Sequence, residues 1–586
     1  MDRRFLDIAE STFRLKEVEG ENKVVSLEEA IRRNVKPGKK LYFSMESNAA
    51  ALELLRQYWG TSPSFTLIMG GISGYHIGLI HYGLVKKLIY SMSSHMHPTP
   101  GPVGVLQAAY KKGVVHMENW SMLSLQQRLM ASAFGVGFMP TKSLVGTGMA
   151  EENKEDFMEI QDPFGTGSKC ALLRALDVDV SIIHGCVADS YGNTILGNPW
   201  DETKWAARAS TDGVVVTVEK IVSTSFIRKH SNLVGIPGYL VNSVSEVPFG
   251  AHPRGLVNSD IKEFEGYGSD YDSMEDYRRA TDDPAKLDDW TTEWVLNCQS
   301  HQDYLRKLGS DRLMLLKKRA DEYAWKHDLE SSSDALSADQ EFTVAEMMIV
   351  AAASKITEIV KSNGYRTILT GIGVSGLAAW LAHIQLLREG YGIDLVFGSG
   401  QYGFAPRPAN PFMASVANVP TCKMLTSLSE IYGIIVGGRN NKCLSILGAA
   451  QIDKQGNLNA SRLGDLFLIG AGGAADAINA QETMVIMRQS RGRFVDSVPY
   501  VSCPGTKVKR LVSTMGIFEK LGDDSEFTLT KYFADHKLAT AEDMVRKVVE
   551  NCGWPLKIAP DISVVQPPTL EELMIIRLLD PKRFYD

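Results

Sequence analysis

The chain has 586 residues, more than one hydrophobic core usually serves, so we expect two or more domains. Hydrophobic residues make up 44% and charged residues 22%, an ordinary composition for a globular protein, and the formal net charge of −7 gives no electrostatic case for nucleic acid. The N-terminus has no apolar signal-peptide core, and no apolar run approaches the roughly 18 residues of a membrane span. We therefore expect a cytoplasmic protein without nucleic-acid or membrane partners.

The seven cysteines are scattered, odd in number and lack CxxC spacing. This pattern argues against a disulfide framework or a zinc site and fits a reducing compartment. We expect no metal.

The first 258 residues alternate between strand and helix patterns. The expected strands are 40–43, 65–69, 85–90, 113–117, 180–187 and 213–218, and the expected helices include 49–58 and 122–134. This alternation predicts a parallel sheet covered by helices. From 259 to 340 the chain turns polar and helical, and it is either a connector between two halves or a terminal hairpin of the first domain.

The second αβ half, 341–586, opens with a helix at 344–362. The strand 366–370, a GxGxxG loop at 371–376 and a helix at 377–387 follow, which is the setting of a dinucleotide fingerprint. The next strand, 393–397, should then end in an acidic residue that holds the ribose hydroxyls. It ends in Gly398, and Asp394 lies at its other end, so we expect no NAD. A second GxGxxG, 398–403, runs into Pro406 and cannot open a regular helix.

A third glycine-rich loop covers residues 470–476. It follows the apolar run 466–469, interpreted as a strand, and precedes an expected helix at 477–483. Such a loop can direct the backbone N–H groups of Gly472 and Gly473 at an oxyanion or a phosphate. A tight turn between strand and helix is the alternative.

Two distant stretches repeat the same pattern of a buried strand followed by a turn. Ser181, Asp189, Gly192 and Asn193 each recur 264 residues later, as Ser445, Asp453, Gly456 and Asn457. Four matches in one frame predict two copies of one fold. The expected fold class is therefore α/β, with two similar open parallel-sheet halves.

The second half resembles the β subunit of the family I CoA-transferases, the glutaconate CoA-transferase group. The matching segments are 370–376, 396–400, 448–459, 470–474, 491–495, 516–518 and 579–582. The first half resembles the α subunit more loosely, through the segments 70–71, 162–164, 188–193 and 248–253. The chain thus resembles both subunits fused, and their shared fold accounts for the repeat.

The resemblance implies an acyl-CoA, and a carboxylic acid as second substrate, bound between the halves. The residues it places at the CoA or at an oxyanion are Gly371, Gly373, Gly398, Gly400, Gln451, Asn457, Gly470, Gly472, Gly473 and Ala474. In the family the strand ending at Phe397 is followed by a glutamate that attacks the thioester and carries CoA from one acid to the other. Gly398 occupies that position here and has no nucleophile.

Either another residue replaces that glutamate or the chemistry has changed. The candidates are Glu46 on a strand–helix loop, Glu118 and His116 at the end of strand 113–117, His95 and His97 in a turn-rich loop, and Ser399, which would need a base within reach. CoA transfer is the family's reaction. Hydrolysis, C–C bond cleavage or decarboxylation of an acyl-CoA, and noncatalytic CoA binding, are the alternatives. We expect a homo-oligomer.

Overall fold

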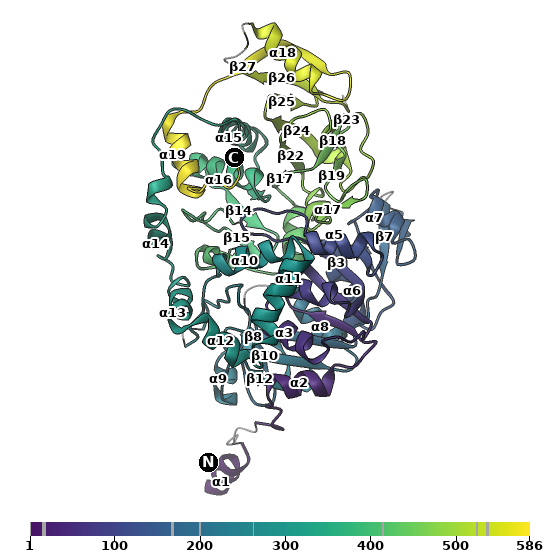
Figure 1. Ribbon diagram of the computed structural model, residues 1–586, viewed down its shortest axis with the longest axis vertical. Helices are drawn as coiled ribbons and strands as arrows, with labels where there is room; N and C mark the ends of the chain where they lie inside the picture. Colours follow the sequence, from purple (N-terminus) through teal and green to yellow (C-terminus); the bar gives the residue numbers. More distant parts are fainter. Residues whose placement is uncertain are drawn as a thin grey trace.

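The computed structural model describes residues 2–13, 19–165, 169–197, 201–261, 263–412, 415–522, 525–534, 538 and 540–586. Two sheet-based halves lie one above the other along the long axis (Figure 1). The first half, in purple and blue, forms the lower part, and the second half, in green and yellow, forms the upper part. Helix α1 (Arg3–Phe13) has no buried residue and lies apart from both.

The first sheet is parallel through most of its width. Its parallel strands, in spatial order, are β12 (Val241–Glu246), β10 (Val214–Ile221), β8 (Val180–Ala188), β1 (Lys40–Phe43), β2 (Phe65–Ile72), β3 (Val85–Ser93) and β4 (His116–Asn119). The short strands β9 (Thr194–Ile195) and β11 (Val234–Ile236) pair antiparallel beyond β8. A separate antiparallel sheet joins β5 (Phe138–Thr141), β7 (Lys169–Arg174) and β6 (Phe157–Gln161).

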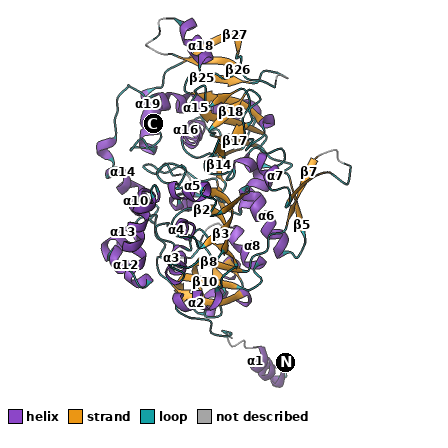
Figure 2. Ribbon diagram, turned by 45° about the vertical axis from the view of Figure 1, so that its right-hand side comes forward, coloured by secondary structure: helices purple, strands orange, loops and turns teal. Residues whose placement is uncertain are grey.

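Helices cover both faces of the first sheet (Figure 2). One face carries α2 (Leu27–Asn34), α3 (Asn48–Gln57), α4 (His76–His81) and α5 (Gly104–Lys111), and the other carries α6 (Met122–Ala133) and α8 (Asp201–Ala209). Two apolar clusters, one on each face, form the core. Because both faces are covered, the strands are continuous apolar runs rather than alternating ones.

The second sheet has a parallel centre with antiparallel pairs on both sides. Its strands, in order, are β16 (Met424–Leu425), β15 (Gln401–Tyr402), β14 (Asp394–Phe397), β13 (Thr367–Leu369), β17 (Cys443–Leu447), β22 (Glu482–Met487), β24 (Val508–Ser513), β25 (Gly516–Glu519), β26 (Thr528–Phe533) and β27 (Lys557–Val565). The strands from β14 to β24 are parallel. Its helices are α15 (Val344–Asn363), α16 (Val374–Arg388), α17 (Ala474–Ala477), α18 (Ala541–Glu550) and α19 (Leu570–Leu579). The predicted α/β fold with two parallel-sheet halves is confirmed.

Three predicted elements differ from the structure. The strand expected at 113–117 is β4, which begins only at His116, because Gly113 has φ +64° and ends the preceding turn. The run 466–469 contributes only β21 (Leu466–Phe467), which pairs with β20 (Arg462–Leu463) outside the main sheet. The helix expected at 477–483 ends at Ala477, since the fully buried run 482–487 is a sheet strand.

The repeated turn has the same hydrogen bonds in both halves. The Asp189 carboxylate accepts bonds from Asn193 N (2.8 Å) and Asn193 Nδ2 (2.8 Å), and the Asn193 Oδ1 accepts one from Gly238 N (2.9 Å). Asp453 accepts from Asn457 N (2.9 Å) and Nδ2 (3.0 Å), and Asn457 Oδ1 accepts from Gly505 N (2.8 Å). The repeat in the sequence is therefore a structural repeat.

The connector is helical and packs mainly on the first half. It contains α10 (Tyr271–Thr281), α11 (Pro284–Thr291), a π-helix (Thr292–Leu296), α12 (His301–Leu308), α13 (Ser310–Lys318) and α14 (Trp325–Glu330). Its side chains Tyr277, Leu287, Val295 and Tyr304 belong to the core cluster of the first sheet. Backbone carbonyls of residues 337, 339 and 341 instead accept from Arg577 of α19. The limits 258 and 340 stay a prediction.

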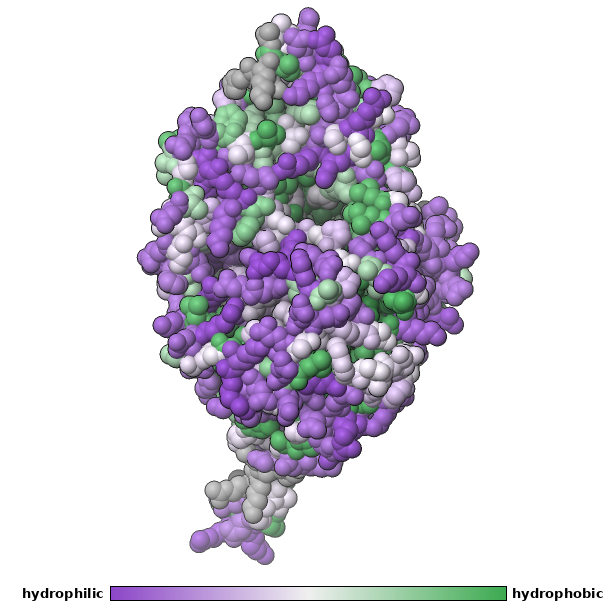
Figure 3. Space-filling model, in the orientation of Figure 1, coloured by the Kyte–Doolittle hydropathy of each residue, from purple (hydrophilic) through white to green (hydrophobic). Residues whose placement is uncertain are grey.

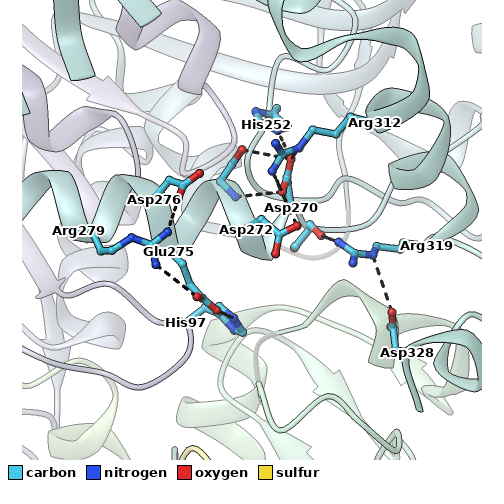
Figure 4. A network of polar contacts seen from close by, with 12 residues as sticks. His97, His252, Asp270, Asp272, Glu275, Asp276, Arg279, Arg312, Arg319 and Asp328 are labelled. Carbon is cyan, nitrogen blue, oxygen red and sulfur yellow. Dashed lines mark hydrogen bonds and ion pairs between the residues drawn. The ribbon is translucent and has the colours of Figure 1, made fainter. Parts of the chain in front are cut away.

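Asp270 ties the connector to the first half (Figure 4). Its carboxylate, 1% exposed, accepts bonds from Arg312 Nε (2.6 Å) and Nη2 (2.8 Å) and lies 2.9 Å from His252 Nε2. Burial alone would raise the pKa of Asp270, but the bonds from His252 and Arg312 hold it well below its usual range. This ionised group fixes α10 and α13 against residues 252–254, which reach the cavity described below.

The face of the molecule in Figure 3 is mostly hydrophilic, and its apolar residues lie in small patches. Within the described ranges, no helix combines the length and apolar character needed to cross a bilayer.

Candidate functional site

A cavity lies between the two halves. The first half contributes Glu46, His184, Leu196, Gly197, Thr203, Arg254, Gly255, Leu256 and Val257, the connector contributes Ser269 and Met274, and the second half contributes Ser399, Gln401, Phe412, Val416 and Val419. The empty space between these residues, open solvent included, is about 670 Å³. Since the wall is built from distant parts of the chain, the cavity exists only when the halves are docked.

Glu46 is the only carboxylate among the described residues that line this cavity. It follows β1 on the loop that leads into α3, and it is 6% exposed. Burial raises the pKa of Glu46 above its ordinary value, although the positive charge of Arg254 opposes this rise. A buried carboxylate with a raised pKa, facing a cavity, is a candidate base or nucleophile.

Arg254 is the cationic partner of this carboxylate. Burial lowers the pKa of Arg254, while Glu46 raises it, and its Nη1 donates to Ser73 Oγ (3.2 Å). A guanidinium in a cavity is suited to hold an anionic group such as a carboxylate. No motif in the sequence points to Arg254, and the one signal for it is that it directly follows the segment 248–253 that resembles the α subunit.

Two residues of the second half line the cavity just beyond β14: Ser399 on the turn that follows it, and Gln401 at the start of β15. Ser399 Oγ and Gln401 Oε1 are both buried and have no hydrogen-bond partner among the described residues. Buried polar atoms are normally bonded, so two unsatisfied ones at one cavity point to a polar ligand. The predicted site residues Glu46 and Ser399 thus share one cavity. No hydrogen bond of the described chain joins them.

His95 and His97 line an adjoining cavity that shares Arg254, Met274 and Phe412 with the first. Burial lowers the pKa of His95 to about 3 and that of His97 to about 4. His95 Nε2 lies 2.6 Å from Thr281 Oγ1, and His97 Nε2 lies 3.3 Å from Glu275 Oε1, as Figure 4 shows for His97. Both rings are therefore neutral at pH 7.

Glu118 and His116 do not reach the cavity. Glu118 pairs with Lys87 (2.6 Å) and Arg128 (3.0 Å) and accepts from Trp120 Nε1 (2.8 Å). Burial alone would raise the pKa of Glu118, but the bonds from Lys87 and Trp120 and the charge of Arg128 bring it below its usual value. His116 is exposed and begins β4, whereas parallel strands bind ligands at their carboxyl ends. The prediction that His116 ends its strand is wrong.

The loop 470–473 docks one half on the other. Ala471 N donates to Asn119 Oδ1 (3.3 Å), Gly472 N to Ser91 O (3.2 Å), and Gly472 O accepts from Met122 N (2.9 Å). The Gly472 N–H is thus used at the interface and is not free for an oxyanion. Among the hydrogen bonds of the described residues, none comes from Gly473 N.

Asp476, in α17, completes this interface. Its carboxylate accepts from Ser121 Oγ (2.7 Å), Leu123 N (2.9 Å) and Ser143 Oγ, all in the first half. It caps the N-terminus of α6, a favourable place for a negative charge. Burial nevertheless raises the pKa of Asp476 to about 6.

A tyrosine fills the space beside Gly398. A Cβ added at Gly398 would overlap the Tyr432 hydroxyl and lie 2.5 Å from its Cζ. A Cβ added at Gly473 would overlap the same hydroxyl. No pattern in the sequence singles out Tyr432.

The remaining predicted residues fall into two groups. Gln451 donates to Gly492 O (3.0 Å) and accepts from Asn459 (2.9 Å), and Asn457 belongs to the repeated turn, so both amides are used structurally. Gly371, Gly373, Gly400, Gly470 and Ala474 are absent from the described cavity wall. Their role at the CoA stays a prediction. The described residues hold no cluster suited to a metal ion.

Comparisons with known proteins relate the chain to CoA-transferases. The coenzyme A transferase family model matches residues 24–247. One of the glutaconate CoA-transferase subunits of Acidaminococcus fermentans is 29% identical over 319 residues, 50% of this chain and 95% of that protein. One of the 3-oxoadipate CoA-transferase subunits of Pseudomonas knackmussii is 29% identical over 263 residues, 41% of this chain and 94% of that one.

One solved structure has the same fold over nearly the whole chain. It is an acyl-CoA transferase of Escherichia coli O157:H7, with a TM-score of 0.64 and 14% identity, covering 96% of this chain and 97% of that one. The relatives and the family model support the resemblance to the family I CoA-transferases, and an acyl-CoA-processing enzyme, nominally a transferase.

Proposed function

We propose that the chain is a fused two-subunit acyl-CoA enzyme that moves CoA between carboxylic acids in the cavity between its halves, with Glu46 as the reacting carboxylate. The observation that carries this proposal is the cavity wall itself. Glu46 and Arg254 face it from the first half, and the unpartnered Ser399 Oγ and Gln401 Oε1 face it from the second. The fusion is supported by a solved structure in which one chain has the same fold across both halves.

In this proposal the thioester carbonyl binds beside Ser399 and the acid carboxylate binds Arg254. A Glu46 oxygen attacks the thioester carbonyl carbon, the C–S bond breaks, and an acyl–Glu46 anhydride and a CoA thiolate form. The thiolate then attacks the Glu46 carbonyl carbon, which releases the first acid and leaves CoA on Glu46 as a thioester. A second acid reverses these steps and leaves as its CoA ester.

A second candidate is hydrolysis or C–C cleavage of an acyl-CoA without a covalent carrier. Tyr432 beside Gly398 favours it, because no side chain fits at the position of the family nucleophile. Glu46 would then take a proton from water or from substrate, a role that its raised pKa suits.

Trapping separates these candidates. The protein is incubated with a panel of short-chain acyl-CoAs and acids, reduced with borohydride, and digested for mass spectrometry, while products are quantified. We expect a reduced Glu46 peptide and a new acyl-CoA. Turnover with free CoA as product and no labelled peptide would support the second candidate, and a label near residue 398 would contradict both. Binding without turnover of any acyl-CoA would favour the noncatalytic alternative.

A further inference from the structure

Tyr432 lies where two glycine loops of the second half meet. It belongs to the π-helical segment Glu430–Val436, which packs on α17 and β17. The extra residue in a π-helical turn displaces side chains from α-helical positions, and such turns are frequent at functional sites. Here the segment brings the phenol between Gly398, at the end of β14, and Gly473, before α17.

Only glycine allows this placement at either loop. A Cβ at Gly398 would overlap the hydroxyl, and a Cβ at Gly473 would overlap it as well and lie 3.0 Å from the ring Cε2. Real Cβ atoms do not approach other atoms so closely, so the phenol or the loop would have to move. The two glycines therefore make one cradle for one hydroxyl.

The hydroxyl is a donor without a partner. No hydrogen bond within the described ranges involves it, and its ring is only half-buried, so one side stays accessible. Burial, and then the negative charge of Asp476, raise the pKa of Tyr432 above its ordinary value, which keeps the phenol protonated at neutral pH. The Gly473 N–H, also unused in the described chain, lies in the same cradle.

We propose that the Tyr432 hydroxyl and the Gly473 N–H together donate hydrogen bonds to the thioester carbonyl oxygen of the acyl-CoA. The Tyr432 hydroxyl takes the space that a side chain at position 398 would occupy. Gly398 directly precedes Ser399, which lines the cavity from the second half, whereas Glu46 lines it from the first. Tyr432 and Gly473 are not among the described residues that line the cavity, so the cradle adjoins its wall through Gly398. Tyr432 is thereby the residue that stabilises the developing oxyanion. This inference rests on the proposed function, because it requires an acyl-CoA in that cavity.

A purely structural role is the alternative. The ring packs in the apolar cluster of the second half, and its removal would leave a void there. Tyr432→Phe separates the two roles, because it keeps the ring and removes only an oxygen that bonds to nothing in the described protein.

The test combines kinetics with a binding readout. We expect Tyr432→Phe to reduce kcat by about a hundredfold, as loss of one oxyanion donor does, with little change in KM and an unchanged Tm. Tyr402→Phe is the matched control, since Tyr402 lies on β15, next to β14, and its hydroxyl already donates to Asp394 (3.1 Å). It should retain wild-type kcat.

The binding readout needs no turnover. A ketone analogue of a short-chain acyl-CoA, with CH₂ in place of sulfur and ¹³C at the carbonyl, is bound to the full chain and observed by NMR. We expect the bound carbonyl resonance to move downfield in the wild type and in Tyr402→Phe, and to lose most of that shift in Tyr432→Phe.

The outcomes separate the two proposals. Equal shifts and equal kcat in wild type and Tyr432→Phe would overturn the role of Tyr432 and leave acyl-CoA binding intact. If the wild type binds no analogue, the proposed function fails, and this inference fails with it. If Tyr432→Phe does not fold, a fluorinated tyrosine of lower phenol pKa at 432 replaces it. If the fluorinated tyrosine changes neither the bound ¹³C carbonyl resonance nor the alkaline limb of the profile of kcat against pH, the proposal is overturned.

Discussion

Glu46 and Gly373 hold the same place in the two halves, yet Glu46 carries a carboxylate and Gly373 has no side chain. In the first sheet Leu41 of β1 pairs with Val180, and in the second sheet Ile368 of β13 pairs with Leu444, 264 residues after Val180. Glu46 and Gly373 each lie five residues beyond these strand positions, on the loop that leads into a helix. The duplicated fold therefore presents a carboxylate from one half and bare backbone from the other.

The comparison extends to the whole site. The first half supplies the titratable groups, Glu46, Arg254, His95 and His97, and the second supplies Ser399, Gln401 and the glycine cradle with Tyr432. A site with acid–base chemistry on one side and hydrogen-bond donors on the other needs both halves. The two halves share one fold, and the side chains on their loops make their chemistry different.

Glu46→Gln should have the largest effect on activity. It removes the only carboxylate on the described cavity wall, and loss of a general base or nucleophile costs about a thousandfold in kcat/KM. Steady-state kinetics measure this loss. In wild type the activity should rise with pH through the raised pKa of Glu46, because the carboxylate form is required.

Two controls sharpen that result. Glu53→Gln changes a buried carboxylate on the adjoining helix α3, paired with Arg56 (3.0 Å), and should leave kcat within about threefold of wild type. The double variant Glu46→Gly with Gly373→Glu moves the carboxylate to the equivalent loop. It should stay as inactive as Glu46→Gln, because Gly373 has φ +81° and is absent from the described cavity wall. Recovery there would mean that the two loops are interchangeable.

Asp476 should make docking of the halves depend on pH. Its pKa of about 6 lies above the ordinary 3.8, so the protonated form is favoured in the folded protein. The stability it contributes is fully present below pH 4 and is lost as the pH rises through 6, a change of about 3 kcal/mol. Thermal unfolding of wild type and Asp476→Asn between pH 4 and 8 measures it. As the pH rises, the Tm of the wild type should fall relative to that of Asp476→Asn. A Tm difference that does not change with pH would contradict the raised pKa of Asp476.

Gly473→Val should reduce turnover by about two orders of magnitude in a folded protein. Its Cβ overlaps the Tyr432 hydroxyl, so the phenol or the loop must move, and the Gly473 N–H moves with it. Gly492→Val, at a glycine with open space around its Cβ, is the control. Wild-type kcat in a folded Gly473→Val protein would remove this loop from the site.

The repeated turns should be equally important for stability. Asp189→Ala and Asp453→Ala each remove a buried carboxylate that accepts bonds from backbone N–H and an Asn side chain, at a cost of about 2–3 kcal/mol. Urea denaturation of both variants tests this equality. If the two losses in free energy of unfolding differ by more than about 1.5 kcal/mol, the turn does not stabilise the two halves equally.

Local patterns in the chain are enough to predict most of the strands and the repeat. Buried runs such as 180–187 and turns such as 189–193 depend on neighbouring residues, so periodicity and turn chemistry identify them. The same local rules identified Glu46 and Ser399 as candidates, and the resemblance predicted Gly398 as a glycine where the family has glutamate.

Which of the candidates work together depends instead on contacts between distant parts of the chain. Glu118 is paired with Lys87 and Arg128, the loop 470–473 is bonded to the first half, and Tyr432 fills the place beside Gly398. Each of these facts is a contact between residues far apart in the chain or on different elements. Burial and pairing set the charge and the freedom of a side chain, and a local pattern carries no information about either.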